Sequence, residues 1–213
     1  MKERPVQMAE IRILVADDHA VTRVGLVSLL ETEKGIRVVG QAENGAEAVA
    51  AAKRLKPDVI IMDLVMPKMD GVEATRHIHQ ALPETGILIL TTFGDSDDIA
   101  HALAAGAAGA LMKNVGIGEL VNAIHAIAEG KQVIAPEIRQ MLKESPPVPE
   151  LTKRQIEILH SVTRGLSNRD IAQQLGITID CVKDHVNAIL TKIGAANRSE
   201  AVAIAFRKHL LKM

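Results

Sequence analysis

Short apolar runs alternate with longer amphipathic stretches through the first 130 residues of the chain. The runs are rich in Val, Ile and Leu without polar interruption, which is typical of strands buried on both faces of a sheet. They predict strands at Ile11–Ala16, Ile36–Gln41, Val59–Met62, Ile87–Thr91 and Ala110–Met112. Helical patterns lie at 20–32, 45–55, 71–81, 96–105 and 117–129. This alternation predicts a doubly wound, flavodoxin-like α/β domain over 11–130, with a five-stranded parallel sheet in the order 2-1-3-4-5.

The pattern changes after residue 130. Pro136 is placed to open a short helix, Glu137–Lys143, and the run Ser145-Pro146-Pro147-Val148-Pro149 then blocks regular structure. Such a run behaves as a semi-rigid spacer. We therefore expect a flexible N-terminal tail at 1–10, a Pro-rich linker with a short helix at 131–150, and a second domain at 151–213.

The second domain shows no strand pattern and reads as all-α. Four helices are expected, at 152–164, 168–175, 179–193 and 198–209. Ser167 and Asp170 have the spacing of a capping box, Gly176 is placed to end that helix, and Thr178 can cap the next one. A short helix, a tight turn containing glycine and a longer helix predict a helix-turn-helix.

Composition narrows the class of protein. Hydrophobic residues make up 47% and charged residues 24%, and no apolar run approaches the ~20 residues that a membrane span needs. The polar start of the chain does not resemble a secretory signal, and the single cysteine, Cys181, suits a reducing compartment. Phe93 and Phe206 are the only aromatic residues, which argues against a base-stacking RNA surface. We expect a cytoplasmic protein with no membrane partner.

The net charge of −1 hides an asymmetry between the two parts of the chain. Residues 1–150 carry a net charge of −6, and residues 151–213 carry +5. A small basic domain suggests a polyanionic partner. Uneven solvated surfaces would explain the charges alone equally well.

Acidic residues follow two of the predicted strands. Asp17 and Asp18 end the first strand, and Asp63 ends the third. These strands flank the point where the strand order reverses, and ligands bind there in open α/β sheets. Three converging carboxylates repel one another, which favours a bound divalent cation. Mg²⁺ suits such a site, because it is a hard cation that prefers oxygen ligands and keeps several waters.

A hydroxyl and an ammonium follow the remaining strands. Thr91 ends the fourth strand and Lys113 follows the fifth. Facing a carboxylate and a cation, these groups suit a phosphoryl group on Asp63. Taken singly, Asp17 and Asp18 would serve as helix caps, Thr91 as a strand end and Lys113 as a solvated cation. The agreement of four strand ends favours a common site.

These motifs together resemble the receiver domain of bacterial response regulators. The resemblance rests on Val15-Ala16-Asp17-Asp18-His19, Ile61-Met62-Asp63-Leu64-Val65-Met66-Pro67 with Asp70-Gly71, Leu90-Thr91-Thr92 and Leu111-Met112-Lys113. It implies that Asp63 is the phosphoacceptor of a sensor histidine kinase. It implies further that Asp17, Asp18, Asp63 and the Val65 carbonyl hold Mg²⁺. Thr91 would be the switch hydroxyl, and Lys113 would bind the phosphate.

One position departs from the receiver pattern. Ala110 stands where receivers usually carry the aromatic residue that follows the switch hydroxyl. We hypothesise that Thr91 instead repacks loop 92–98 and the fourth helix directly. Val65 and Phe93 are apolar and offer no group to orient an attacking water, which predicts slow autodephosphorylation.

The helix at 179–193 separates an apolar stripe from a polar face. The stripe is Val182, Val186, Ile189 and Ile193, at core-facing spacing. The opposite side, here called the recognition face, is Asp180, Lys183, Asp184, Asn187 and Thr191. Lys, Asn and Asp can each bind base edges in a major groove, whereas Thr178, Lys192 and Arg198 are candidates for phosphate contacts. A merely solvated face is an equal alternative for Asp184 and Thr191. We expect His185 to be packed and Cys181 to be buried.

The second domain resembles the LuxR-type helix-turn-helix. The matching segments are Leu151-Thr152-Lys153-Arg154, Gly165-Leu166-Ser167-Asn168-Arg169-Asp170-Ile171-Ala172, Val182-Lys183-Asp184-His185-Val186 and Asn197-Arg198-Ser199-Glu200-Ala201. Gln155 replaces the usual Glu, and Cys181 replaces the usual Thr. The whole chain is similar to NarL/FixJ-family response regulators. This similarity implies a transcription factor, with no enzymatic activity of its own, that forms a homodimer and binds double-stranded promoter DNA when phosphorylated.

Two other functions remain open from the sequence. One is a phosphatase acting through an aspartyl-phosphate, but Val65 stands where such an enzyme needs a second carboxylate. The other is a phosphorylation-independent DNA-binding regulator with a vestigial receiver, to which Ala110 lends some weight.

Overall fold

The computed structural model of the chain describes residues 10–92, 96–144, 151–207 and 210. The chain forms two compact units that divide after residue 146. The tail predicted at 1–10, except Glu10, and the Pro-rich spacer at 145–149 lie outside the described residues. Within the described ranges, no helix combines the length and apolar character needed to cross a membrane.

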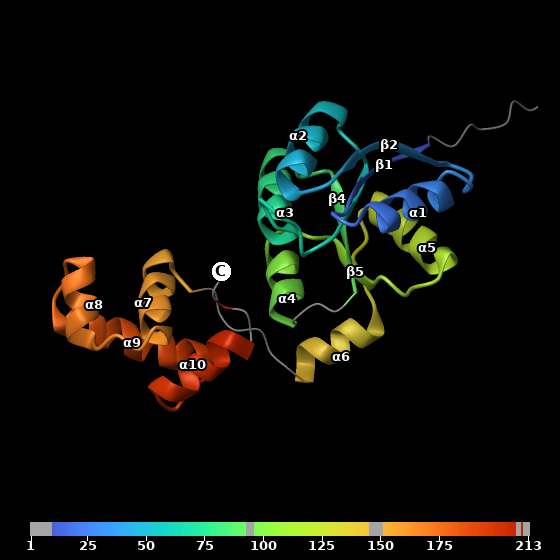
Figure 1. The fold of residues 1–213 in the computed structure, drawn as a ribbon. Coiled ribbons are helices and arrows are strands. Elements are labelled where there is room, and N and C mark those ends of the chain that lie inside the picture. Colours follow the sequence, from blue (N-terminus) through green and yellow to red (C-terminus); the bar gives the residue numbers. More distant parts are fainter. Residues whose placement is uncertain (1–9, 93–95, 145–150, 208–209, 211–213) are drawn as a thin grey trace, which may run out of the picture. The chain divides into compact units, whose positions relative to one another are not determined.

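The first unit is a parallel sheet between two layers of helices. Its strands are β1 Ile11–Ala16, β2 Ile36–Ala42, β3 Val59–Met62, β4 Gly86–Thr91, β5 Gly109–Met112 and β6 Val133–Ile134. Its helices are α1 Ala20–Leu30, α2 Gly45–Leu55, α3 Gly71–Ala81, α4 Ser96–Ala104, α5 Ile117–Ala128 and α6 Pro136–Glu144. Figure 1 shows α1 and α5 on one side of the sheet and α2, α3 and α4 on the other. The strand order is β2-β1-β3-β4-β5-β6, which confirms the predicted order of the first five strands.

The register of the strands brings their carboxyl ends to one level. Ala16 of β1 pairs with Met62 of β3, and the N–H of the next residue, Asp63, donates to the Ala16 carbonyl at 2.9 Å. Thr91 of β4 pairs in the same way with Met112 of β5. The residues that follow β1, β3 and β5 are therefore placed side by side at one edge of the sheet.

A sixth strand and a packed helix continue the first unit beyond its predicted boundary. β6 pairs with β5, and α6 contacts both β5 and α4. Ile138 of α6 is fully buried in the core of this unit. A Cβ atom on Gly109 would lie 2.4 Å from the Val133 carbonyl oxygen, so glycine permits the close approach of β6. The sheet therefore has one strand more than the five predicted, and residues 133–144, which fall within the linker predicted at 131–150, form a strand and a helix of the first unit.

The second unit consists of helices over 151–207, with no strand among these residues. They are α7 Lys153–Thr163, α8 Asn168–Leu175, α9 Ile179–Ile193 and α10 Arg198–Arg207. The predicted capping box of Ser167 and Asp170 is present, and Gly176 ends α8 in the left-handed conformation with φ 63°. Thr178 caps α9. The helix-turn-helix prediction is confirmed in these details.

Candidate functional site

Two buried carboxylates meet a lysine at the carboxyl edge of the sheet. Asp17 follows β1 and Asp63 follows β3, and their side chains are 2% and 6% exposed. Lys113, which follows β5, places its Nζ 2.7 Å from Asp17 Oδ2 and 2.8 Å from Asp63 Oδ2. The ammonium bridges two anionic groups that would otherwise repel each other. The structure thus brings three of the predicted residues into direct contact.

The environment of Asp63 suits an incoming anionic group. Its Oδ1 accepts a hydrogen bond of 2.8 Å from the Leu64 N–H, while its Oδ2 binds Lys113. Burial raises the pKa of Asp63, and Lys113 only partly opposes this effect. Burial also disfavours the Lys113 ammonium, but hydrogen bonds to Asp17 and Asp63 outweigh it and raise the pKa of Lys113. A desolvated cation held beside a carboxylate can stabilise negative charge that develops there.

The acidic cluster extends to Asp18 and His19, whose side chains are more exposed than those of Asp17 and Asp63. Ligand atoms of Asp17, Asp18, His19 and Asp63 all lie within 4.8 Å of one another. His19 Nδ1 is 2.7 Å from Asp18 Oδ1. This close contact lacks hydrogen-bond geometry, and among the described residues the buried oxygen accepts no hydrogen bond. An oxygen-rich cluster with an unsatisfied carboxylate oxygen fits a hard divalent cation.

Thr91 and Val65, two further residues predicted for this site, differ in burial. Thr91 is 2% exposed at the end of β4, and its main-chain carbonyl accepts a hydrogen bond of 2.6 Å from the Lys113 N–H. Val65, two residues after Asp63, has 67% of its surface exposed. Phe93, predicted to lie close to them, falls outside the described residues.

A buried arginine beside the pocket was not predicted. Arg23 of α1 is 7% exposed, and its guanidinium donates to the Asp17 carbonyl and to Glu43. Arg23 is the single charged residue of a mainly apolar helix, and this was the available signal, since a cation buried by such a helix needs a partner. The predictions considered only the residues at the strand ends.

The recognition face of α9 consists of exposed side chains. Lys183, Asp184, Asn187 and Thr191 are all exposed, and Lys183 Nζ lies 3.0 Å from Asp180 Oδ1. Val182, Ile189 and Ile193 are buried, and Val186 packs against them, as the periodicity predicted. The helix therefore separates a core stripe from a solvent-facing polar side along most of its length.

The three candidates for phosphate contacts already have partners in the domain. The Thr178 Oγ1 accepts from the Cys181 N–H at 3.2 Å, and Lys192 Nζ donates to Gln155 Oε1 at 3.0 Å. Arg198 donates to Asn168 Oδ1 at 3.1 Å and to the Leu166 carbonyl. The Thr178 contact caps α9, whereas those of Lys192 and Arg198 tie the last turn of α9 to α7 and the start of α10 to the start of α8.

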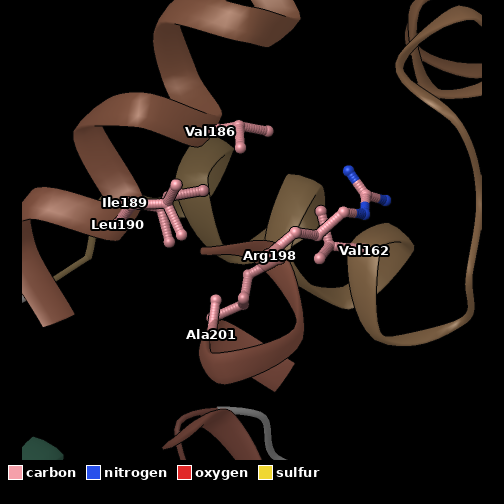
Figure 2. A pocket seen from close by; sticks show the side chains of 7 residues that line it. Val162, Val186, Ile189, Leu190, Arg198 and Ala201 are labelled. Atoms are coloured by element: carbon pink, nitrogen blue, oxygen red, sulfur yellow. The ribbon is translucent and has the colours of Figure 1, made fainter. Parts of the chain in front are cut away.

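A shallow apolar hollow lies beside Arg198 in the same domain. Its lining is Leu159, Val162, Val186, Ile189, Leu190, Arg198 and Ala201. Figure 2 shows the aliphatic part of Arg198 passing Ala201 and Val162, with the guanidinium directed away from α9. The hollow therefore lies between core side chains, behind the recognition face.

Two expectations for α9 have different outcomes. Cys181 is exposed, so the prediction that it is buried was wrong. It lies in the first turn, next to the exposed residue Asp180, and the helical phase turns it away from the core stripe. His185 is half-buried, in agreement with the packed side chain that was expected.

Comparisons with known proteins agree with both halves of the chain. The family model of the response regulator receiver domain matches residues 13–125, and that of the luxR family of bacterial regulatory proteins matches residues 149–205. The response regulator protein VraR of Staphylococcus aureus is 39% identical over 207 residues, which cover 95% of this chain and 99% of VraR.

Solved structures show the same organisation. The response regulator ChrA of a heme-sensing two-component system is 38% identical, covers 95% of this chain and 100% of its own, and has a TM-score of 0.58. A LuxR-family two-component response regulator from Aurantimonas sp. SI85-9A1 is also 38% identical. It covers 64% of this chain and 97% of its own, with a TM-score of 0.60. The chain therefore belongs to the NarL/FixJ family of two-component response regulators, with a receiver domain and a LuxR-type DNA-binding domain.

Proposed function

We propose that phosphorylation of Asp63 by a sensor histidine kinase switches this transcription regulator. The observation that carries the proposal is the buried contact of Lys113 with both Asp63 and Asp17. A carboxylate oxygen of Asp63 attacks the phosphorus of the kinase phosphohistidine. The P–O bond forms as the P–N bond breaks, and the imidazole nitrogen keeps the electron pair. This intact acceptor centre gives no support to a vestigial receiver.

The residues around Asp63 have different roles in the phosphoryl transfer. Asp17, Asp18, Asp63 and the Val65 carbonyl would hold Mg²⁺, which supplies positive charge against the phosphoryl oxygens when bound. Lys113, whose Nζ lies 2.8 Å from Asp63 Oδ2, supplies a second positive charge beside the acceptor. Thr91, buried at the end of β4, supplies the hydroxyl that responds to the new group.

The signal leaves the pocket through α4 and α6. Ala110 carries no aromatic ring, so the aromatic rotamer that usually follows the switch hydroxyl is missing from β5. α4 follows Thr91 in the chain, α4 contacts α6, and α6 ends at Glu144, two residues before the division between the units. Movement of Thr91 therefore repacks α4 and shifts α6, which changes the start of the connection to the DNA-binding domain.

Substitution of Thr91 tests this route. Thr91→Ala should take up the phosphoryl group but should not dimerise on phosphorylation, as measured by light scattering after size-exclusion chromatography. Thr32→Ala, which removes an exposed hydroxyl at the end of α1, is the matched control. Phosphorylation-dependent dimerisation that persists in Thr91→Ala would contradict the route.

The second domain acts on promoter DNA. In the proposed complex, α9 enters the major groove with Lys183, Asp184, Asn187 and Thr191 toward the base edges, and Thr178, Lys192 and Arg198 lie near phosphates. Lys192 and Arg198 would either contact phosphates while keeping their hydrogen bonds within the domain or exchange those partners for phosphates. A homodimer formed on activation binds paired half-sites and adds affinity without new base contacts. The protein acts in the cytoplasm without an enzymatic reaction beyond its own phosphorylation.

The lifetime of the phosphorylated state depends on whether a side chain close to Asp63 can orient an attacking water. Val65 is exposed and apolar beside Asp63, and it offers no group to orient an attacking water. We expect the phosphoprotein to persist well beyond seconds after removal of the donor. Loss of the adduct within seconds would contradict this expectation.

Intact mass after incubation with acetyl phosphate and Mg²⁺ tests the acceptor. The wild-type chain should gain one phosphoryl group, and Asp63→Asn should gain none. Asp58→Asn is the matched control, because Asp58 immediately precedes the start of β3, whereas Asp63 immediately follows its end. An adduct on Asp63→Asn, or none on the wild type, would contradict the proposal.

A further inference from the structure

Arg23 is a buried cation that the transfer mechanism leaves unused. It lies in the first half of α1, and 7% of its surface is exposed. A guanidinium is expensive to bury unless its donors have well-placed acceptors. The identity of its acceptors therefore shows what the residue stabilises.

The two ends of the guanidinium fork hold different loops. Arg23 Nη1 donates to the main-chain carbonyl of Asp17 at 2.6 Å, and Nη2 donates to Glu43 Oε1 at 2.6 Å. Asp17 belongs to the loop between β1 and α1, and Glu43 to the loop between β2 and α2. A planar fork with several donors can bridge two acceptors, whereas a lysine ammonium at the same place is a point charge on a different stem.

The loop that holds Glu43 is itself connected to the phosphoacceptor loop. The neighbouring residue Asn44 caps α2, and the Gly45 N–H donates to the Met69 carbonyl at 3.0 Å. A Cβ atom on Gly45 would lie 2.6 Å from that carbonyl oxygen, so the two loops are closely packed. Met69 lies between Asp63 and α3. Arg23 thus joins the first acidic loop to a chain of contacts that ends beside the loop of Asp63.

The carboxylate of Asp17 depends on this main chain for its direction. Asp17 Oδ1 accepts from the His19 N–H at 2.8 Å, within the same loop that Arg23 holds by its carbonyl. Within the part of the chain that the structure describes, the Arg23 guanidinium makes no hydrogen bond to the carboxylates of Asp17, Asp18 or Asp63, so it acts on them through the backbone. Partners outside the first layer of ligands commonly set metal affinity in this way.

We propose that Arg23 is a positioning residue for the cation pocket, and that its clamp between Asp17 and Glu43 pre-organises the acidic loop for Mg²⁺. The inference rests on the proposed Mg²⁺ site. Without the clamp, the loop must be ordered at the moment of binding, and the cation binds more weakly. The chemistry at Asp63 itself is unchanged once the cation is bound.

The test compares Arg23→Lys with the wild type in the full chain. The first readout is the Mg²⁺ concentration that gives half of the cation-dependent rise in Tm of the unphosphorylated protein. We expect this concentration to increase about 10-fold in Arg23→Lys. The second readout is phosphorylation by acetyl phosphate, whose Mg²⁺ requirement should shift equally while the rate at saturating Mg²⁺ stays near that of the wild type.

Two further variants keep the outcome decisive. Glu43→Gln keeps an acceptor but removes the negative charge, and we expect a shift of about 3-fold in the same direction. Arg37→Lys is the matched control, because Arg37 is 71% exposed and lies 4.0 Å from Glu10, and it should leave the half-saturating concentration unchanged. If Arg23→Lys fails to fold, Glu43→Gln decides the question alone.

An unchanged Mg²⁺ half-saturation in Arg23→Lys, with a lower Tm in the absence of Mg²⁺, would show a merely structural role and overturn the inference. So would an unchanged value in Glu43→Gln, should Arg23→Lys not fold. The proposed function fails differently, through a wild-type chain that takes up no phosphoryl group. The thermal titration with Mg²⁺ needs no phosphorylation and therefore separates the two failures.

Discussion

The acidic pocket of the receiver and the recognition face of α9 both concentrate charged side chains, but they differ in burial. The side chains of Asp17 and Asp63 are 2% and 6% exposed, and residues after three different strands meet there. Lys183 and Asp180 on α9 are 58% and 86% exposed and come from a single helix. Buried charges interact strongly with one another, whereas exposed charges are screened. The effect of a substitution in the pocket should therefore reach the other charged residues there, whereas a substitution on α9 should affect little beyond the substituted residue.

The largest difference is expected between two lysines. Lys113→Met leaves Asp17 and Asp63 facing each other without a cation and should lower the free energy of unfolding by roughly 3 kcal/mol, with Mg²⁺ restoring part of it. Lys183→Met breaks only the exposed pair with Asp180 and should cost about 0–1 kcal/mol. Urea denaturation with and without Mg²⁺ measures both. Equal losses would break the comparison.

Two glycines of the receiver differ in how closely they are packed, and alanine at each position tests the crowding of the pocket. A Cβ atom on Gly71 would lie 2.1 Å from the Asp63 carbonyl oxygen, so Gly71→Ala should displace the acceptor loop and cost about 1–3 kcal/mol. Phosphorylation by acetyl phosphate should slow as well. Gly118 of α5 has open space around it, and Gly118→Ala should stabilise the domain by roughly 0.5–1 kcal/mol. A fully active Gly71→Ala protein would show that the pocket is not crowded.

On α9, the expected effect concerns DNA rather than stability. Asn187→Ala should weaken binding to the selected DNA site by about 1–3 kcal/mol if the amide binds an adenine. Phosphorylation and Tm should stay at wild-type values, because Asn187 is exposed. Ser199→Ala, exposed in the first turn of α10, serves as the control. Fluorescence anisotropy with a labelled duplex measures the change, and wild-type affinity in Asn187→Ala would remove this residue from the proposed interface.

The smallest expected effect is a pH dependence at the start of α8. Hydrogen bonds from Ser167 hold the pKa of Asp170 below its ordinary value. A lowered pKa in the folded state contributes stability above the unfolded pKa, and this is lost as the pH falls below about 4. Asp170→Asn should therefore have a lower Tm than the wild type at pH 7, and the gap should narrow as the pH is lowered below about 4. A gap independent of pH would contradict this assignment.

The acceptor centre was predictable because strand order converts sequence positions into neighbours. Asp17, Asp63 and Lys113 each follow a strand that is plain in the apolar pattern, and parallel pairing places their ends at one edge. The capping residues of α8 and α9 were predictable from local spacing alone. The acceptor centre could be predicted from the order of the strands, and the caps could be predicted from residues within a single turn.

The features that were missed depend on contacts between distant segments. β6 has two residues, too few to show a period, and it forms because Gly109 lets Val133 approach β5. Arg23 reads as a surface residue until its acceptors Asp17 and Glu43 are placed around it. Cys181 was expected to be buried from its residue type, but its phase on α9 exposes it.

DNA binding with and without phosphorylation tests the central claim most directly. The wild-type chain first enriches a duplex from a randomised pool, and its Kd for that duplex is measured before and after treatment with acetyl phosphate and Mg²⁺. Asp63→Asn receives the same treatment. Phosphorylation of Asp63 should tighten wild-type binding by roughly 10-fold or more through dimerisation and leave Asp63→Asn unchanged. Equal affinity in all samples would contradict the account and identify a regulator that binds DNA independently of its receiver.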